Sequence, residues 1–304
     1  MINRPLCSII IPTYNRCDLI KFTLNSLLYQ SVPNECIEVI VVDDGSIDNT
    51  QHVVKSYQDV LTLKYFFQDD RGNRTAAARN LGIENAEGDI IIFIDSGVLL
   101  GPRCVEKHLN AHRLQRNACA VVGYVYGFDQ KEEDFEKLKD IINTDNPDQT
   151  IKYLRTTGLF PDMRESFYTS HGYSISNVPA PWAFFITCNC SVHKSTLCLT
   201  GCFDENLDYH WGVEDLELGY RLNQQGVKFL VERDAEAIHY PHPANMKSKF
   251  EDERINKVYF HQKHNDKATE LFLECGFLEI NEELMSRNQD PINRNVAKNT
   301  GESI

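Results

Sequence analysis

The segment that decides the fold is IEVIVVDDGS at residues 37–46, in which Val and Ile fill five of the six positions before Asp43 and Asp44. A nearly continuous run of Val and Ile is typical of a strand covered on both faces. The segments CSIIIPTY (7–14), LTLKYFF (61–67) and DIIIFID (89–95) have a similar character, and helical patterns separate the four runs. This alternation predicts βαβ units, and therefore an α/β fold with a mainly parallel central sheet flanked by helices.

Polar residues follow three of these predicted strands. They are PTYNR at 12–16, DDGS at 43–46 and DSG at 95–97. In open α/β sheets, ligands bind beyond the carboxyl ends of the strands, where the connecting loops gather. We therefore expect the three loops to converge on one crevice, with Asp95 on its rim.

Composition narrows the class of protein. The chain has 304 residues with a net charge of −13, and this charge argues against nucleic acid as the main partner, since phosphate backbones require a surplus of Lys and Arg. No apolar run is long enough to span a bilayer, and a cytoplasmic protein is the expectation. The ten cysteines include no C-x-x-C pair and are interpreted as reduced thiols. A zinc site is the less favoured alternative, at Cys188, Cys190, Cys198 and Cys202.

The rest of the chain suggests two halves of one domain and an extension. The two halves are predicted at residues 1–125 and 126–245, and residues 246–304 are predicted to be a helical C-terminal extension with a polar tail. We expect strand character in 181–194, a His- and Pro-rich loop at 235–243, and a frayed chain from Asn281 onward.

Six motifs follow one another along the chain, namely SIIIPTYNR, IEVIVVDDGSIDNT, AAARNLGI, GDIIIFIDSG, GCFDENL and WGVEDLELGYRL. In this order they resemble the family-2 glycosyltransferases of the GT-A fold, with a galactosyltransferase-type acceptor region in the second half. A set of motifs at fixed offsets is much more specific than any one of them. The resemblance covers about residues 6–245, and it implies a Rossmann-like GT-A domain that uses a nucleotide-sugar. It further implies that residues 1–125 are the nucleotide-sugar-binding half and 126–245 the acceptor and catalytic half, and we expect 129–177 to carry acceptor specificity or a mobile lid.

The donor side of the predicted site offers groups that can recognise a uracil nucleotide. A carboxylate can accept the N3–H of uracil, and an aromatic or backbone wall can cover its flat ring. Asp43 and Asp44 supply carboxylates, while Pro12, Thr13 and Tyr14 supply the wall. The resemblance implies that Asp43 contacts the base or ribose, and turn and helix-cap chemistry explains Asp44–Ser46 equally well.

The resemblance also implies that Arg79 faces the nucleotide, although an Arg on a helix is ordinarily solvated. Arg71 and Arg74 in the preceding loop are weaker candidates for phosphate contacts.

The sequence departs from the family at the metal-binding motif. Members usually carry D-x-D, whose acids hold a divalent ion on the diphosphate, whereas this chain has Asp95-Ser96-Gly97. In one interpretation, Mn²⁺ or Mg²⁺ is bound by Asp95 with His239 or His242, because imidazole favours Mn²⁺. The two histidines are otherwise part of a Pro-rigidified surface loop. In the other interpretation, cationic side chains hold the phosphates.

The motif WGVEDLELGYRL carries the predicted base. Inverting transfer is a single displacement in which a carboxylate takes the proton of the acceptor nucleophile. The family's ED motif implies Asp215 as base and Glu214 as a supporting acid, although acids are also common at helix starts. Trp211 is a candidate to stack on a sugar face or to pack in the core.

These motifs predict an inverting glycosyltransferase that uses a UDP-sugar, or alternatively a dTDP-sugar, with a saccharide, small-molecule or peptide acceptor. A catalytically inactive module that binds nucleotide-sugar or glycan is the second hypothesis, motivated by the reduced D-x-D. A Rossmann oxidoreductase is excluded because no G-x-G-x-x-G follows the first strand.

Overall fold

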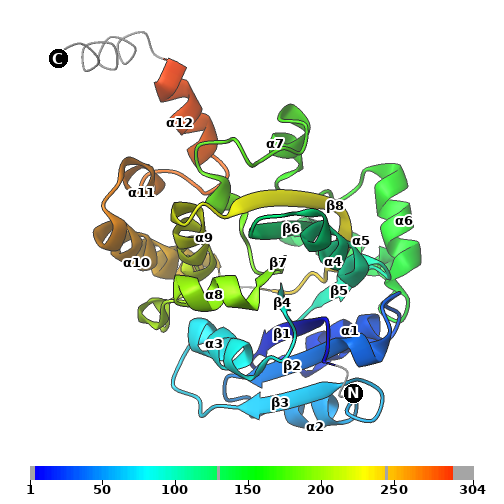
Figure 1. Ribbon diagram of the computed structural model, residues 1–304. Coiled ribbons are helices and arrows are strands. Elements are labelled where there is room, and N and C mark those ends of the chain that lie inside the picture. The colour runs from blue at the N-terminus through cyan, green and yellow to red at the C-terminus, as the bar shows by residue number, and fades with distance from the viewer. Residues whose placement is uncertain (1–3, 129–130, 244–245, 290–304) are drawn as a thin grey trace, which may run out of the picture.

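The computed structural model describes residues 4–128, 131–243 and 246–289. An eight-stranded sheet in the order β3-β2-β1-β4-β7-β6-β8-β5 crosses the molecule, with helices on both sides (Figure 1). The pairs β3–β2, β2–β1, β1–β4 and β6–β8 are parallel, and β4–β7, β7–β6 and β8–β5 are antiparallel. The strands are β1 Cys7–Thr13, β2 Ile37–Asp43, β3 Leu63–Phe67, β4 Ile90–Ile94, β5 Val98–Leu100, β6 Cys119–Tyr126, β7 Asn189–His193 and β8 Lys228–His239.

Most helices of the first half connect successive parallel strands, and those of the second half cover the sheet or extend from it. Short 3₁₀ helices occur at Asn34–Cys36, Glu132–Asp134, Pro181–Phe184 and Glu205–Leu207. The α-helices are α1 Cys17–Leu27, α2 Thr50–Lys55, α3 Thr75–Asn85, α4 Cys104–Leu114, α5 Phe135–Ile141, α6 Pro147–Thr157, α7 Glu165–Ser170, α8 Lys194–Thr200, α9 Glu214–Gln224, α10 Met246–His264, α11 Lys267–Phe272 and α12 Ile280–Gln289.

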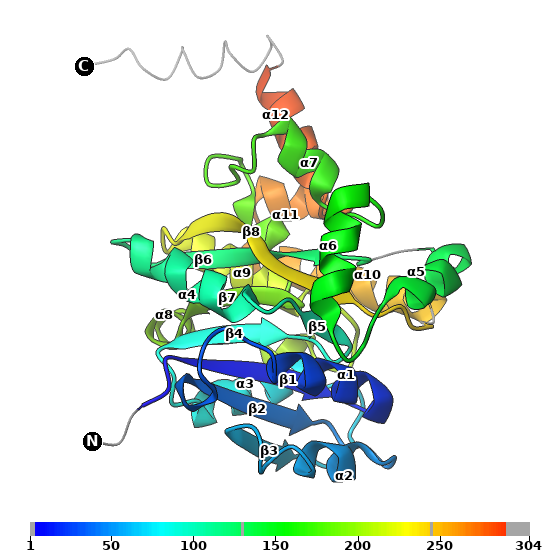
Figure 2. The same ribbon diagram turned by 90° about the vertical axis from the view of Figure 1, so that its right-hand side faces the viewer.

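Two apolar cores lie on opposite faces of the sheet, as continuous Val and Ile strands require. Ile9 and Ile11 of β1 belong to the core that includes Leu24 of α1, whereas Ile10 belongs to the core that includes Ala78 of α3. Figure 2 shows α1 and α2 in front of the first strands and α3 behind them. Each fully buried Ile contributes about 1.5–3 kcal/mol. The strand ends are therefore held by rigid packing on both sides.

The second half contains the differences from the sequence-based expectations. The prediction of a loop at 235–243 is wrong up to residue 239, because β8 continues to His239 and pairs there with β5. The region 181–194 is divided between a 3₁₀ helix and β7. The prediction of a frayed chain from Asn281 onward is wrong up to residue 289, because these residues belong to α12 and Asn281 is buried. The predicted tail at 290–304, residues 129–130 and residue 245 lie outside the described residues.

The sheet continues across the predicted boundary at residue 125, because β6 spans it and pairs with β7 and β8. The division into a donor half and an acceptor half stays a prediction. The less favoured zinc alternative is not supported: no group of three or more His, Cys, Asp or Glu side chains suited to a metal is found in the ranges that the structure describes. None of the helices within those ranges has the length and apolar character needed to cross a membrane.

Candidate active site

The ends of β1, β2 and β4 bring the predicted donor-side residues to one edge of the sheet. Thr13 and Asp43 are register partners at the ends of β1 and β2, and β4 pairs with β1 on its other side. The backbone N–H of Asp44 donates to the carbonyl oxygen of Thr13 at 2.9 Å, which ties the two loops together. Pro12 is the penultimate residue of β1, and Tyr14 and Ser96 lie in the loops that follow β1 and β4. The predicted convergence of the loops is therefore confirmed.

Both acids after β2 are engaged within the protein. Asp43 is fully buried, and its carboxylate accepts from the Ser46 N–H at 2.7 Å and from the Tyr65 hydroxyl at 2.7 Å. Asp44 accepts from the backbone N–H of Arg74 at 2.7 Å and from its guanidinium at 3.1 Å. Turn chemistry thus accounts for much of this motif. A carboxylate has further acceptor sites, so the contact of Asp43 with a nucleotide stays a prediction.

Arg79 connects the two ends of the site. Its Nη1 lies 2.7 Å from Oε1 of Glu214 at the start of α9, and its Nη2 lies 3.2 Å from Oδ1 of Asp95 at the end of β4. The side chain is buried, and its guanidinium lies 5.4 Å from the ring centroid of Phe203. The acid that closes β4 and the acids that open α9 therefore face one another across a shared cation.

The charge of Arg79 is fixed by these neighbours. Burial by itself would lower the pKa of this guanidinium, but the carboxylates of Glu214, Asp95 and Asp215 raise it. Its buried Nε has no hydrogen-bond partner among the described residues. A buried donor without a partner is unusual and is often explained by a ligand or ordered water.

Asp215 lies beside this pair at the first turn of α9. Its Oδ2 accepts from the Thr187 N–H at 3.3 Å and its Oδ1 from the Leu216 N–H at 2.8 Å. Burial, followed by the negative charge of Glu214, raises the pKa of Asp215 to about 7, and Arg79 opposes this rise. A carboxyl group with a pKa near the working pH is well suited to general base catalysis.

A strained backbone precedes the two acids. Val213 is the N-cap of α9 and has a φ of 78°, a left-handed conformation that a β-branched residue rarely adopts. Gly212 before it has a φ of 86°, and Val213 itself is buried. Such strain persists only where packing holds it, and it is common near functional sites. Here it lies directly before Glu214 and Asp215, the first two residues of α9.

His239 and His242 lie close together at the end of β8. Their ring centroids are 5.2 Å apart, and the His239 ring also meets Phe128 edge-on at 5.3 Å. Burial, then His242 and Arg16, lower the pKa of His239 to about 3, and burial and Arg16 also lower the pKa of His242. Both imidazoles are therefore neutral at neutral pH.

Arg16 is a site residue that the sequence reasoning did not single out. It precedes α1 in the PTYNR loop, is half-buried, and is near enough to Asp95 for that carboxylate to oppose the lowering of its pKa by burial. The only signal in the sequence was the position of its loop after the first strand.

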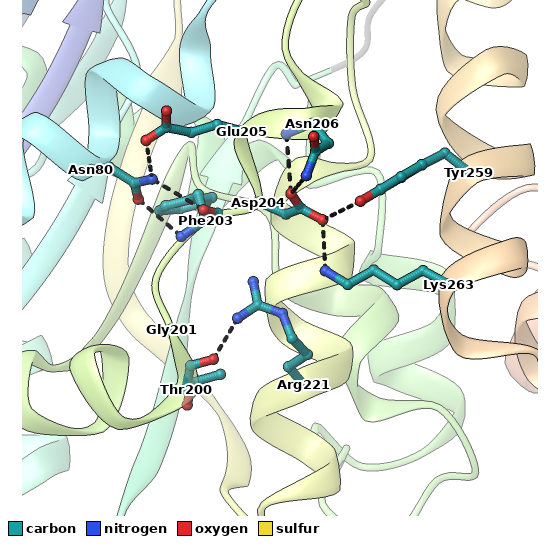
Figure 3. Close-up of a pocket in the computed structure, with 10 residues that line it drawn as sticks. All are labelled: Asn80, Thr200, Gly201, Phe203, Asp204, Glu205, Asn206, Arg221, Tyr259 and Lys263. Atoms are coloured by element: carbon teal, nitrogen blue, oxygen red, sulfur yellow. Dashed lines mark hydrogen bonds and ion pairs between the residues drawn. The ribbon is translucent and has the colours of Figure 1, made fainter.

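Two further features border the site. Trp211 is 43% exposed, with the Lys249 Nζ 4.3 Å from its ring centroid, so it is not a core residue. A cavity of about 620 Å³ is lined by residues that include Phe203 and Asp204. Figure 3 shows that its polar groups bond to one another, with Lys263 2.6 Å from Asp204 and Arg221 bonded to the carbonyl of Thr200.

Residues 8–175 match the family described as Glycosyl transferase family 2. The chain belongs to this family. The resemblance inferred from the motifs is confirmed. A validoxylamine A glucosyltransferase from Streptomyces hygroscopicus subsp. jinggangensis is 38% identical over 268 residues, which cover 88% of this chain and 63% of the relative. The uncharacterized glycosyltransferase YfnE of Bacillus subtilis is 33% identical over 281 residues, covering 85% of this chain and 70% of YfnE. The chain thus spans less than two thirds of the validoxylamine A glucosyltransferase.

Comparison with solved structures confirms the GT-A fold of this chain. The mannosyltransferase PcManGT from Pyrobaculum calidifontis, in complex with GDP-Man and Mn²⁺, has a TM-score of 0.61 at 17% identity, with 98% of this chain and 80% of that chain covered. S. aureus TarS 1–349 in complex with UDP-GlcNAc has a TM-score of 0.56 at 19% identity, with 83% and 65% covered. At these identities the likeness establishes the fold alone.

The family implies a divalent cation, and the donor set at Asp95 does not fit one. No three possible ligands form a metal-binding group in the described ranges, so Asp95, His239 and His242 do not make such a set. One oxygen of Asp95 already accepts from Arg79, and the positive charge of Arg16 lies close to the same carboxylate. No step below therefore involves an ion.

Proposed function

We propose that the chain is an inverting glycosyltransferase that transfers a hexose from a UDP-sugar to an acceptor nucleophile. The observation that carries this proposal is the Arg79 bridge, which places the donor-side acid Asp95 opposite Glu214, with Asp215 beside it. The name of the validoxylamine A glucosyltransferase favours a glucosyl donor, and the UDP-GlcNAc bound to TarS favours UDP as the carrier.

In the proposed reaction, Asp215 takes the proton from the acceptor as its oxygen forms a bond to the anomeric carbon. The bond from that carbon to the diphosphate oxygen breaks, and its electron pair leaves with UDP. Attack from the face opposite the leaving group inverts the anomeric centre. Asp215 can accept the proton because a pKa of about 7 leaves a large fraction ionised at neutral pH and makes the group strongly basic for a carboxylate.

The other residues orient the substrates in this proposal. Arg79 holds Glu214, so the first turn of α9 keeps a fixed position relative to β4. We further propose that Asp43, at the end of β2, contacts the uridine, with Thr13 and Tyr14 forming the wall beside it. The exposed indole of Trp211 offers a flat face to a sugar ring.

The test is a panel of UDP-glucose, UDP-GlcNAc, dTDP-glucose and GDP-mannose, with release of the nucleoside diphosphate measured over a range of acceptors. Turnover with a UDP-sugar and an inverted anomeric product is expected. Asp215→Asn should lose transfer by 100-fold or more, in the range of about 10²–10⁴ for general base catalysis, while still binding UDP.

The second candidate function is an inactive nucleotide-sugar-binding module, which the reduced motif Asp95-Ser96-Gly97 favours. Calorimetry with UDP-glucose distinguishes the two. Binding of the donor with no turnover over the whole acceptor panel would support the module and contradict the enzyme.

A further inference from the structure

The loop after β4 has a backbone conformation that favours glycine at the third position of the motif Asp95-Ser96-Gly97. Gly97 has a φ of +100°, where an L-residue such as aspartate is strained. Its N–H donates to the Thr23 hydroxyl of α1 at 2.9 Å, and Leu19 lies beside its Cα. The second acid of the D-x-D motif is therefore replaced by a backbone conformation that disfavours it.

The same packing brings Arg16 to Asp95. Contacts between α1 and the loop at Gly97, together with the Phe22 ring 4.9 Å from the Tyr240 ring, fix the start of α1 against the ends of β4 and β8. Arg16 comes just before this helix. Its side chain donates no hydrogen bond to any residue in the described ranges, although it is half-buried. A guanidinium with free donors thus lies at the place where the family holds the diphosphate.

The charges at this place differ from those of a cation site. Arg79 lies 3.2 Å from Asp95, and the carboxylate of Asp95 also interacts with the charge of Arg16. The positive charge of Arg16 beside Asp95 opposes the binding of a divalent cation by that carboxylate and favours an anion. A guanidinium presents several N–H donors in a plane and binds phosphate oxygens in pairs.

We propose that Arg16 binds the diphosphate of the donor in place of a divalent cation, so that transfer does not require a metal. As the bond between the anomeric carbon and the diphosphate oxygen breaks, the electron pair stays on that oxygen, and Arg16 stabilises the added charge by hydrogen bonding. The proton of the acceptor goes to Asp215, so no other reactant is needed. The inference rests on the proposed function.

The experiment has a binding arm that does not depend on turnover. Isothermal titration with UDP in EDTA is carried out on the wild type, Arg16→Gln, Arg16→Lys and Arg113→Gln. The last variant removes the same charge from an exposed position of α4 and serves as the control. UDP should bind the wild type and Arg113→Gln equally, Arg16→Gln about tenfold more weakly, and Arg16→Lys between them. Matching circular dichroism and melting curves show that the variants are folded.

The kinetic arm uses the UDP-sugar that is active in the panel. Wild-type kcat should change by less than about twofold between EDTA and added Mn²⁺, and Arg16→Gln should lower kcat about 100-fold, as for the loss of one donor to a developing charge. The proposal is overturned if EDTA abolishes UDP binding or turnover of the wild type and Mn²⁺ restores it, or if Arg16→Gln binds UDP as the wild type does. An absence of turnover with normal UDP binding would instead reject the proposed function.

Discussion

The raised pKa of Asp215 predicts how transfer depends on pH. Burial and the charge of Glu214 raise this pKa from 3.8 to about 7. A base with that pKa is about one tenth ionised at pH 6 and about nine tenths ionised at pH 8, so the rate should rise about tenfold between them. The carboxylate must be ionised to accept a proton, and the rate therefore rises with pH rather than falling.

Glu214→Gln tests the cause of the shift. The variant removes the nearest negative charge and releases Arg79 from its bond to Oε1 of Glu214, and both changes stabilise the ionised form of Asp215. The midpoint of the pH–rate profile should therefore move below 7. The assay is kcat against pH at saturating UDP-sugar, with Glu205→Gln as a control for the loss of a carboxylate outside the site.

Two results would refute this reasoning. One is a wild-type profile that is flat between about pH 6 and about pH 8 while the chemical step limits the rate. The other is an Asp215→Asn variant that keeps the full rate. Either result would place the base elsewhere.

Two stability predictions concern buried polar groups. His108 and His112 have pKa values lowered by burial to about 4 and about 3, so the unfolded chain takes up their protons first and stability falls as the pH drops below 6.5. At pH 5 each of the two histidines should lower the unfolding free energy by about 2 kcal/mol. The variant His112→Gln should therefore lose less unfolding free energy than the wild type between about pH 7.5 and about pH 5, as measured by urea unfolding. An equal loss in the two proteins would contradict the assignment. Asn281 bonds both backbone groups of Ala180, at 2.8 and 2.9 Å, so Asn281→Ala should lower the unfolding free energy by about 2 kcal/mol. Glu282→Ala, at the exposed neighbouring position, should change it by less than about 0.5 kcal/mol, and equal effects would contradict the role of Asn281.

The first half of the fold could be predicted because β1, β2 and β4 are rich in Val and Ile and are buried on both faces, as Ile37–Asp43 shows. Burial of this kind leaves a local signal in the sequence. The strand Val98–Leu100 has only three residues, too few for a periodicity, and it forms through pairing with β8. The end of β8 at His239 was hidden by the His- and Pro-rich residues that follow it. These elements depend on partners far away in the sequence, as does Asn281 in α12.

The residues of the candidate site also fall into those that the sequence could reveal and those that it could not. Asp95, Glu214 and Asp215 could be found from motifs, because each stands at the end of a strand or the start of a helix. The bridge made by Arg79 and the position of Arg16 could not, since an isolated arginine has no local pattern that separates a solvated side chain from one turned inward. Their roles appear only when α1, α3 and α9 are packed together.

Charge balance separates the roles of the two arginines. The chain carries a net charge of −13, so a diphosphate must be met by cations placed locally. The single charge of Arg79 is already shared between Asp95 and Glu214 at 3.2 and 2.7 Å, and it has little left to offer a phosphate. Arg16 acts on the same Asp95 without a hydrogen bond to any described residue. Arg79 therefore suits the task of holding the acids in place, and Arg16 suits the task of binding the leaving group.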